Sequence, residues 1–231
     1  MIEVKNLEKS YNGTTVVHIP SLEILAGETV GLVGNNGAGK TTLFRMILDL
    51  IRPTKGEVCS KGLQVAQSEE WKRYTGSHLD EGFLIDYLTP EEYFKFTGDL
   101  HGLTGGDIHE RLLPFLDLFN DEVLQQRKYI RDFSKGNQKK IGIAAAALSN
   151  PEVLILDEPF ANLDPSSQIR LKNLLKTLRD QRQMTMLISS HDLSHVTEVC
   201  ERIVILEKGR VVQDMATTEN TLQALEAYFT V

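Results

Sequence analysis

The stretch Gly34-Asn35-Asn36-Gly37-Ala38-Gly39-Lys40-Thr41 decides the fold class of this chain. It matches G-x-x-x-x-G-K-[ST], the Walker A pattern of a loop that surrounds the phosphates of a nucleotide. An apolar run at 30–33 precedes it and is typical of a buried strand, and residues 41–50 place apolar side chains at helical spacing. Because strand, glycine-rich loop and helix follow in the order that the motif requires, a chance glycine-rich turn explains the pattern less well.

The residues of this loop have distinct expected roles in holding ATP and Mg²⁺. Glycine lets the backbone pass close to phosphate oxygens, and the amides of the loop and of the helix N-terminus point toward the anion. Lys40 is expected to reach the β- and γ-phosphates, and Thr41 to ligate Mg²⁺ through its hydroxyl. The residues predicted to bind the nucleotide are Gly34, Asn35, Asn36, Gly37, Ala38, Gly39, Lys40, Thr41 and Thr42.

Composition and charge limit the classes of function. The 231 residues are 41% hydrophobic and 25% charged, which is ordinary for one globular domain or one domain with an inserted subdomain. The net charge of −7 argues against a polyanion-binding surface, so we expect no nucleic-acid partner. Cys59 and Cys200 give neither a disulfide framework nor a metal-ligand spacing, and they are typical of a reducing compartment.

Signals for secretion or membrane insertion are not expected in this sequence. Residues 1–5 open directly into a strand-like pattern rather than a signal peptide. The apolar stretches all fall short of the roughly 20 residues that a helix needs to cross a bilayer. If this protein works at a membrane, we therefore expect another chain to hold it there.

A second chemical motif follows the apolar run at 153–156, which is typical of a parallel strand buried on both faces. Asp157 and Glu158 come directly after it, at the strand end where open α/β sheets bind ligands. Asp157 matches the Walker B position that holds Mg²⁺, and Glu158 has the place of a general base that orients the attacking water. Acidic residues at a solvated strand end are the alternative, and their pairing with the P-loop argues against it.

A third apolar run, at 184–188, ends in Ser189-Ser190-His191. A histidine at a strand end is often structural, but near a γ-phosphate His191 would donate a hydrogen bond to phosphate or to the attacking water. Between the second and third runs, Asp164 and Pro165 form a helix start. The aspartate is the expected N-cap, and the proline is the expected first helical residue.

These motifs, in this order, resemble those of the nucleotide-binding subunit of an ATP-binding cassette (ABC) transporter. The family's signature, Leu-Ser-Gly-Gly-Gln, has a counterpart in Phe133-Ser134-Lys135-Gly136-Asn137. Its lysine resembles the signature of exporter-type cassettes, and Asn137 is one methylene shorter than the family's glutamine. The resemblance implies that Ser134, Gly136 and Asn137 contact ATP bound by a second subunit in a head-to-tail dimer. From the residues alone, Ser134 before a helix over 136–148 is either part of an anion-binding helix terminus or a plain N-cap.

Three further positions take their roles from the resemblance. Tyr11 lies where the family places an aromatic side chain that stacks on adenine, with packing in a β-layer as the alternative. Asp164 matches the aspartate of the D-loop, which communicates across the dimer. Asp80 falls where the family has the Q-loop glutamine. A carboxylate there is a further candidate ligand of Mg²⁺ or water, although it adds negative charge beside the γ-phosphate.

The predicted fold class is α/β. We expect a P-loop NTPase core with a mainly parallel sheet, an N-terminal antiparallel β-layer and an inserted α-helical subdomain, together forming one ABC ATPase domain over 1–231. The expected parts are the β-layer at 1–30 and about 54–66, the RecA-like core at about 30–54, 66–85 and 151–215, the helical subdomain at about 86–150, and a C-terminal helix at 216–231.

Aromatic residues gather at the start of the helical insertion. Thr89, Pro90 and Glu92 form a capping box with proline at the first helical position, so a helix is predicted from residue 90. The aromatic residues near this start are Phe83, Tyr87, Phe94 and Phe96. They are expected to form either a groove that receives a short helix of a membrane subunit or the ordinary core of the insertion.

The resemblance implies an Mg²⁺-dependent ATPase that powers an exporter-like transporter through closure of two cassettes. Lys40, Thr41 and Asp157 would hold ATP and Mg²⁺, and the expected catalytic residues are Lys40, Glu158 and His191. The expected partners are a second ABC subunit, in a homodimer, and one or more separate multi-span membrane subunits. The protein would then lie at the cytoplasmic face of the inner or plasma membrane, attached through these partners.

Two other classes of P-loop protein remain as alternatives. Soluble ABC machines of the translation type usually carry two cassettes in one chain, and those that act on DNA carry a long coiled coil between Walker A and the signature. Neither feature is present here. A P-loop kinase would leave the signature, the D-loop and His191 without a joint explanation. The transported substrate is not predicted, because in this family the membrane subunits mainly select it.

Overall fold

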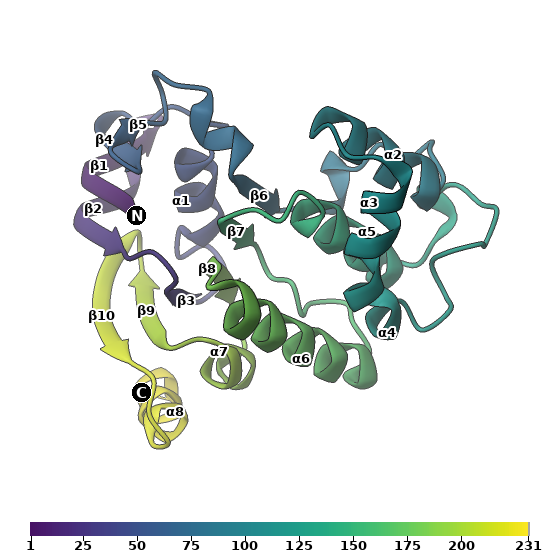
Figure 1. Cartoon of the computed structure of the whole chain (residues 1–231). Helices are drawn as coiled ribbons and strands as arrows, with labels where there is room; N and C mark the ends of the chain where they lie inside the picture. The colour runs from purple at the N-terminus through teal and green to yellow at the C-terminus, as the bar shows by residue number, and fades with distance from the viewer. Residues whose placement is uncertain (231) are drawn as a thin grey trace.

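The chain folds around two β-sheets (Figure 1). The computed structural model describes the backbone of residues 1–230 and the side chains of this range except those at 81, 182 and 228–230. The N-terminal sheet is antiparallel and has the strand order β2-β1-β4-β5. Its strands are β1 (Ile2–Tyr11), β2 (Thr14–Ile24), β4 (Lys55–Ser60) and β5 (Leu63–Gln64).

The second sheet is mainly parallel and has the strand order β10-β9-β3-β8-β7-β6. The strands from β9 to β6 pair in parallel, and β10 is antiparallel to β9. The strands are β3 (Thr29–Val33), β6 (Thr75–His78), β7 (Val153–Leu156), β8 (Thr185–Ser190), β9 (Arg202–Glu207) and β10 (Arg210–Ala216). The chain returns between successive parallel strands, so their carboxyl ends meet at one edge of the sheet.

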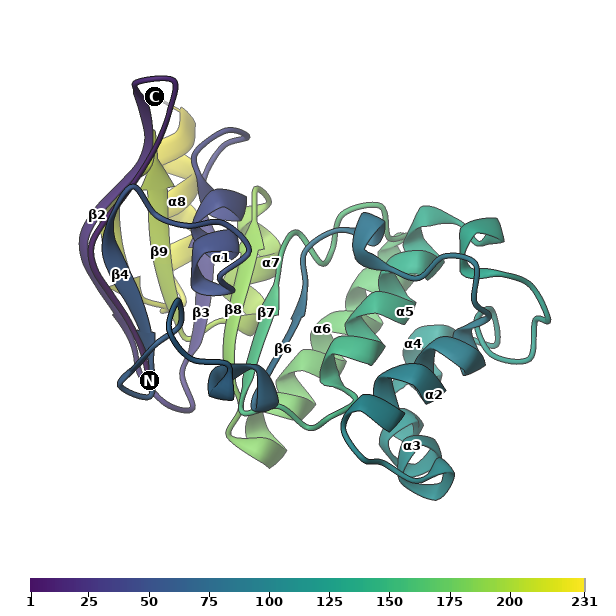
Figure 2. The same ribbon diagram turned by 90° about the horizontal axis from the view of Figure 1, so that it is seen from above.

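A group of helices lies to one side of the second sheet, between β6 and β7 in the chain (Figures 1 and 2). These helices are α2 (Pro90–Leu100), α3 (Gly105–Leu112), α4 (Leu116–Phe119) and α5 (Lys135–Ala147). The other helices are α1 (Lys40–Ile47), α6 (Pro165–Arg182), α7 (Leu193–Val199) and α8 (Thr221–Thr230). Short 3₁₀ turns lie at Glu70–Arg73, Glu81–Phe83, Leu113–Phe115 and Ile130–Asp132. The predicted α/β class, with an antiparallel layer and inserted helices, is confirmed.

Three inner strands of the second sheet, β3, β7 and β8, are buried on both faces, as their apolar runs predict. Successive side chains of a strand point to opposite faces. Val153 and Ile155 of β7 join the core that α1 forms with the N-terminal sheet, and Figure 2 shows α1 between the two sheets. Leu154 and Leu156 join the core on the other face, with α5 and α6. The P-loop at the start of α1 and the acidic residues after β7 are thereby held by two packed layers.

Helix α1 ends at Ile47, earlier than the end at residue 50 that the apolar spacing predicts. Asp49 adopts a left-handed conformation with φ 51°. The Leu50 amide donates to the Arg45 carbonyl, and the Asp49 amide donates to the Met46 carbonyl, at 2.8 and 3.2 Å. This pair of bonds is a Schellman motif, which closes the last turn and ends the helix.

The predicted helix starts agree with the observed caps. The Thr89 hydroxyl accepts from the Glu92 amide and the Glu92 carboxylate accepts from the Thr89 amide, which completes the capping box before α2. Asp164 caps α6, with Pro165 at its first position. Helix α5 begins at Lys135, one residue before the prediction, because Ser134 is its N-cap.

The C-terminal segment continues the second sheet before it becomes helical. Strand β10 extends to Ala216, and α8 begins at Thr221. Leu225 of α8 is buried in the same core as Val196 and Val199 of α7. The predicted helix over 216–231 therefore starts later than expected, and its last residue, at 231, lies outside the described residues. Among the residues that the structure describes, no helix combines the length and the apolar character needed to cross a bilayer.

Candidate active site

The P-loop connects β3 to α1 and leaves the first turn of the helix open to an anion. Gly39 is the N-cap of α1 with φ 105°, a conformation that side chains with a Cβ rarely adopt. No side chain caps α1, and no acidic residue lies in its first turn. The loop is closed by a hydrogen bond that the Ala38 amide donates to the Asn35 carbonyl at 3.0 Å. The free amides and the helix dipole favour phosphate at this point.

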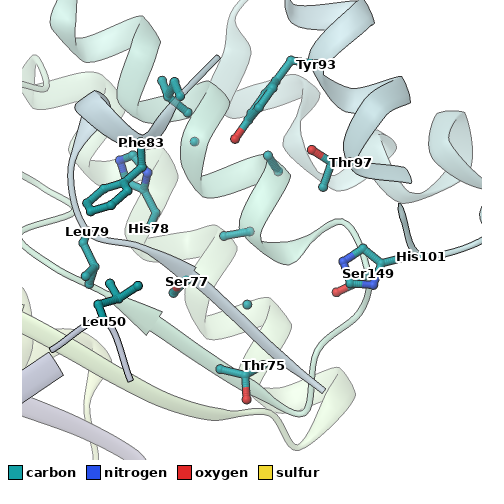
Figure 3. A pocket seen from close by; sticks show the side chains of 15 residues that line it. Leu50, Thr75, Ser77, His78, Leu79, Phe83, Tyr93, Thr97, His101 and Ser149 are labelled. Atoms are coloured by element: carbon teal, nitrogen blue, oxygen red, sulfur yellow. The ribbon is translucent and has the colours of Figure 1, made fainter. Parts of the chain in front are cut away.

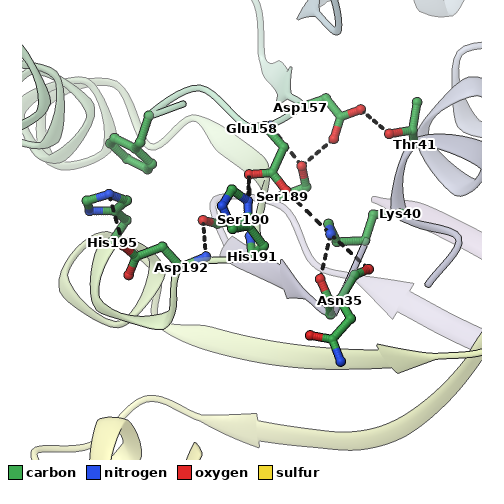
Figure 4. A network of polar contacts seen from close by, with 12 residues as sticks. Asn35, Lys40, Thr41, Asp157, Glu158, Ser189, Ser190, His191, Asp192 and His195 are labelled. Carbon is green, nitrogen blue, oxygen red and sulfur yellow. Dashed lines mark hydrogen bonds and ion pairs between the residues drawn. The ribbon is translucent and has the colours of Figure 1, made fainter. Parts of the chain in front are cut away.

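Lys40 places its ammonium inside the loop (Figure 4). Lys40 is only 6% exposed, and its Nζ donates to the Gly34 carbonyl at 2.6 Å. The same nitrogen lies 3.3 Å from Oε1 of Glu158. This Oε1 is buried and accepts no hydrogen bond from the described residues. The ammonium therefore joins the P-loop to the carboxylate that follows β7.

Thr41 and Asp157 form the oxygen pair that the sequence assigns to Mg²⁺. The Thr41 hydroxyl donates to Oδ2 of Asp157 at 2.5 Å, and the Ser189 hydroxyl donates to Oδ1. Burial raises the pKa of the Asp157 carboxyl, and the Glu158 charge acts in the same direction, while the bonds from Ser189 and Thr41 oppose the shift. A cation at these oxygens would offset the cost of burying the charge.

The residues present fit a Mg²⁺ ion that shares its ligands with phosphates. No group of three or more His, Cys, Asp or Glu side chains in the described part of the chain is arranged to hold a metal. Mg²⁺ is characteristically bound by one or two protein oxygens together with substrate phosphates and water. Thr41 and Asp157 supply two side chains with oxygen ligands beside the P-loop. The site therefore suits Mg²⁺ bound to a nucleotide better than a free Mg²⁺ ion.

Glu158 is the centre of the polar network (Figure 4). Its Oε2 lies 2.8 Å from Nδ1 of His191 and accepts from the His191 amide at 3.3 Å. Its backbone has φ 47°, and its amide donates to the Ser189 hydroxyl at 2.9 Å. The side chain is thus held on one oxygen by His191 and approached on the other by Lys40.

A pocket of about 340 Å³ opens over these groups. It is lined by Tyr11, Val16, Asn36, Gly37, Ala38, Gly39, Lys40, Thr41, Thr42 and Glu158. Tyr11 is 48% exposed, and Nζ of Lys9 lies 4.9 Å from its ring centre. Since the ring faces the pocket and solvent rather than a core, it is available for stacking on a base.

The three signature residues lie outside this pocket. Ser134 is exposed and caps α5 by accepting from the Asn137 amide at 3.2 Å, as the plain N-cap interpretation expects. Gly136 faces the loop after β7, where an added Cβ would meet the Asn162 carbonyl at 2.8 Å. The contact of these residues with ATP bound by a second subunit stays a prediction.

Asp80 does not join the polar network in the described part of the chain. It lies beyond the end of β6, is exposed, and accepts from the Gly82 amide at 2.6 Å through Oδ1. It makes no described hydrogen bond with Thr41, Asp157 or Glu158. The carboxylate thus closes a local turn, and a role in binding Mg²⁺ stays a prediction for this position.

Ser189 lies in the candidate site, and the sequence predicts no role for it. In the parallel register Leu156 lies opposite Ile188, so Asp157 and Ser189 are the next pair along β7 and β8. The Ser189 hydroxyl contacts both the Asp157 carboxylate and the Glu158 amide. The signal available in the sequence was the pair of serines that ends an apolar run directly before His191.

Comparison with known proteins decides the family. The ABC transporter family model matches residues 17–161, which is more than half of the chain. The chain belongs to the ABC transporter family. The structure is similar to the dimeric structure of the ATP-binding cassette MJ0796 in a post-hydrolysis state with ADP and Pi. The TM-score is 0.83, at 26% identity over 94% of this chain and 99% of that one.

Two curated ABC relatives carry names that refer to transport. The methionine import ATP-binding protein MetN of Carboxydothermus hydrogenoformans is 33% identical over 227 residues, 95% of this chain and 67% of that protein. The bacitracin transport ATP-binding protein BcrA of Enterococcus faecalis is 34% identical over 220 residues, 95% of this chain and 70% of that protein. The chain spans 57% of the length of a further ABC relative, from Nostoc sp..

These similarities confirm the predictions of the family and of an ABC-type ATPase. ATP binding follows from the family and from the nucleotide-bound neighbour. The roles of individual residues stay predictions.

Proposed function

We propose that this chain is the ATP-hydrolysing subunit of an exporter, in which two cassettes close head to tail on two ATP molecules. The observation that carries the proposal is the position of Glu158, whose carboxylate lies between Lys40 of the P-loop and His191. Asp157 and Thr41 lie beside it with the oxygens that suit Mg²⁺. Residues for binding phosphate, for binding a metal ion and for activating water thus lie close together.

In the proposed reaction Glu158 orients the water that attacks the γ-phosphate and accepts its proton. His191 holds Glu158 in place through Oε2 and lies ready to donate to the phosphate. Lys40 moves its ammonium from the Gly34 carbonyl to the β- and γ-phosphates. Bound Mg²⁺, held by Thr41 and Asp157, would neutralise charge on the phosphate oxygens. These roles need only local movements of side chains that already lie together.

The dimer arrangement is supported by where the signature lies. Ser134, Gly136 and Asn137 are at the start of α5, outside the pocket of their own chain. In the proposed dimer they close over the ATP of the other subunit, with the first amides of α5 directed at its γ-phosphate. A dimeric cassette among the structural neighbours supports this geometry. Asp164 caps α6 close to the same interface and would fix the loop that meets the partner.

A groove beside β6 supports a membrane partner (Figure 3). It has a volume of about 300 Å³, and its lining includes Leu50, Leu79, Phe83 and Tyr93. Phe83 is 57% exposed and the nearby Tyr87 is 64% exposed. By contrast, Phe94 is buried in the core of the inserted helices. Some of the aromatic side chains near the start of the insertion are therefore exposed and others form core. The exposed ones are suited to contact an apolar helix of a separate multi-span subunit.

The proposed direction is export, and the proposed place is the cytoplasmic face of the inner or plasma membrane. Lys135 in the signature supports export, and the relative whose name refers to bacitracin transport supports a role in transport. The relative whose name refers to methionine import shows that related cassettes also serve the other direction. Identifying the membrane subunit would therefore test the proposed direction.

The proposal is tested by isolating the partner. A tagged Glu158→Gln protein is extracted from its native membranes in mild detergent with ATP, and the proteins bound to it are identified by mass spectrometry. We expect a stoichiometric multi-span membrane protein. A matched variant that also carries Phe83→Ala and Tyr87→Ala should lose it while keeping its stability, because exposed side chains contribute little to folding. Recovery of soluble partners alone would contradict transport.

A further inference from the structure

Lys139 lies in α5, within the inserted helices, and reaches into the loop that follows β7. The residue is 5% exposed, and its Nζ donates to the backbone carbonyl of Glu158 at 2.9 Å. A buried ammonium is costly unless polar groups receive its protons. The contact therefore links α5 to the Glu158 backbone.

The carbonyl that accepts from Lys139 belongs to a residue with an unusual backbone. Glu158 has φ 47°, a left-handed conformation that costs free energy in a residue other than glycine. Its carbonyl also accepts from the Ala161 amide at 3.2 Å. A second, charged donor stabilises this conformation, because bonds from ionised groups are stronger than those from neutral ones. The orientation of the Glu158 side chain depends on the same backbone.

A second contact joins the same helix to the same loop. Gly136, one turn before Lys139, packs so closely on the Asn162 carbonyl that a Cβ would lie 2.8 Å from it. The first turns of α5 thus meet the loop at both Glu158 and Asn162. The signature at the start of α5 therefore packs directly against the loop that carries Glu158.

We propose that Lys139 is a positioning residue for ATP hydrolysis: it holds the backbone of Glu158, and with it the carboxylate, in register with the signature helix of the same chain. The inference rests on the proposed role of Glu158 as the group that orients water. The residues that we propose to bind ATP are those of the P-loop, whereas the Lys139 contact described above is with the Glu158 backbone. Removing the ammonium should therefore slow the chemical step more than it weakens binding.

The test compares three lysine variants in the full-length protein. Lys139→Met should lower kcat by about tenfold to a hundredfold while the KM for ATP changes by less than about threefold. Lys139→Arg, which keeps a charged donor, should recover part of the loss. The matched control is Lys172→Met, which removes an ammonium of a lysine that is likewise buried, at 9% exposure, and bound to Glu198 at 2.7 Å, outside the pocket. This control should keep the wild-type kcat. If Lys139→Met does not fold, Lys139→Gln, which retains a neutral donor, takes its place.

A double-variant comparison separates positioning from a general structural effect. If Lys139 acts through Glu158, adding Lys139→Met to Glu158→Gln should leave the residual turnover within about twofold of Glu158→Gln alone. A further loss in the double variant, or a wild-type kcat in Lys139→Met while Glu158→Gln is inactive, overturns this inference alone. Wild-type turnover in Glu158→Gln overturns the role of Glu158 and the inference together.

Discussion

Nδ1 of His191 lies 2.8 Å from Oε2 of Glu158, and the His191 amide donates to the same oxygen at 3.3 Å. Both residues follow the carboxyl ends of neighbouring parallel strands, β7 and β8. Sheet geometry thus places a histidine against a carboxylate although 33 positions separate them in the chain. We propose that this contact gives His191 a role before any phosphate is bound, in which it orients the carboxylate that we assign to water activation.

We expect His191→Ala to lower ATP turnover by about a hundredfold, because Glu158 loses its orienting partner and the phosphate loses a donor. The affinity for ATP should change by less than about threefold, since the P-loop is untouched. Steady-state turnover and equilibrium nucleotide binding measure the two effects. An equal loss in both would mean that His191 acts in binding rather than in the chemical step.

We expect Asp157→Asn to stabilise the nucleotide-free fold at pH 7 and to reduce Mg²⁺-dependent turnover by about a hundredfold or more. Burial raises the pKa of Asp157 above the ordinary value of 3.8. The wild-type carboxyl therefore contributes most stability below 3.8, and this contribution is lost as pH rises through the raised pKa. Thermal unfolding of both proteins from pH 4 to 8 measures the difference, which should grow in favour of the variant with rising pH. A difference that shrinks with rising pH would contradict this account.

We expect Asp164→Ala to destabilise the fold by about 1 kcal/mol, because α6 loses its N-cap. Hydrogen bonds from the Ser166 and Ser167 hydroxyls and from the Ser167 amide lower the pKa of Asp164. The carboxylate therefore contributes stability above about pH 4, and the contribution is lost as the pH falls through the lowered pKa. Denaturant unfolding at pH 7 measures the loss. Asp164→Asn keeps an acceptor and is the matched control, so equal destabilisation by both variants would exclude capping as the cause.

The parts of the site that the sequence could predict are those encoded by local chemistry. Gly39 and Lys40 belong to a motif in which every residue type has a local reason. Thr89 and Asp164 are caps whose partners lie within three residues. Such features depend on the chain over a few positions, so the structure reproduces them almost residue by residue.

The parts that the sequence could not predict depend on distant segments or on backbone conformation. The contacts of Ser189 with Asp157, and of Lys139 with Glu158, join residues 32 and 19 positions apart. The early end of α1 depends on a left-handed Asp49, which apolar spacing does not encode. The predicted role of Asp80 in binding Mg²⁺ comes from its place in a motif. The hydrogen bond that Asp80 accepts from the Gly82 amide depends instead on a local turn. Tertiary packing decides the two long-range contacts, and local backbone conformation decides the other two features.

Glu158→Gln tests the central claim most directly, with ATP binding, dimerisation and turnover measured on the same sample. Glutamine keeps the shape of the side chain but cannot accept a proton from water. We predict ATP affinity within about threefold of wild type, turnover reduced by about a hundredfold or more, and a dimer that accumulates when ATP is added. Lys40→Ala is the matched control and should lose nucleotide binding and dimer together. Wild-type turnover in Glu158→Gln would contradict the assignment of Glu158 as the group that activates water.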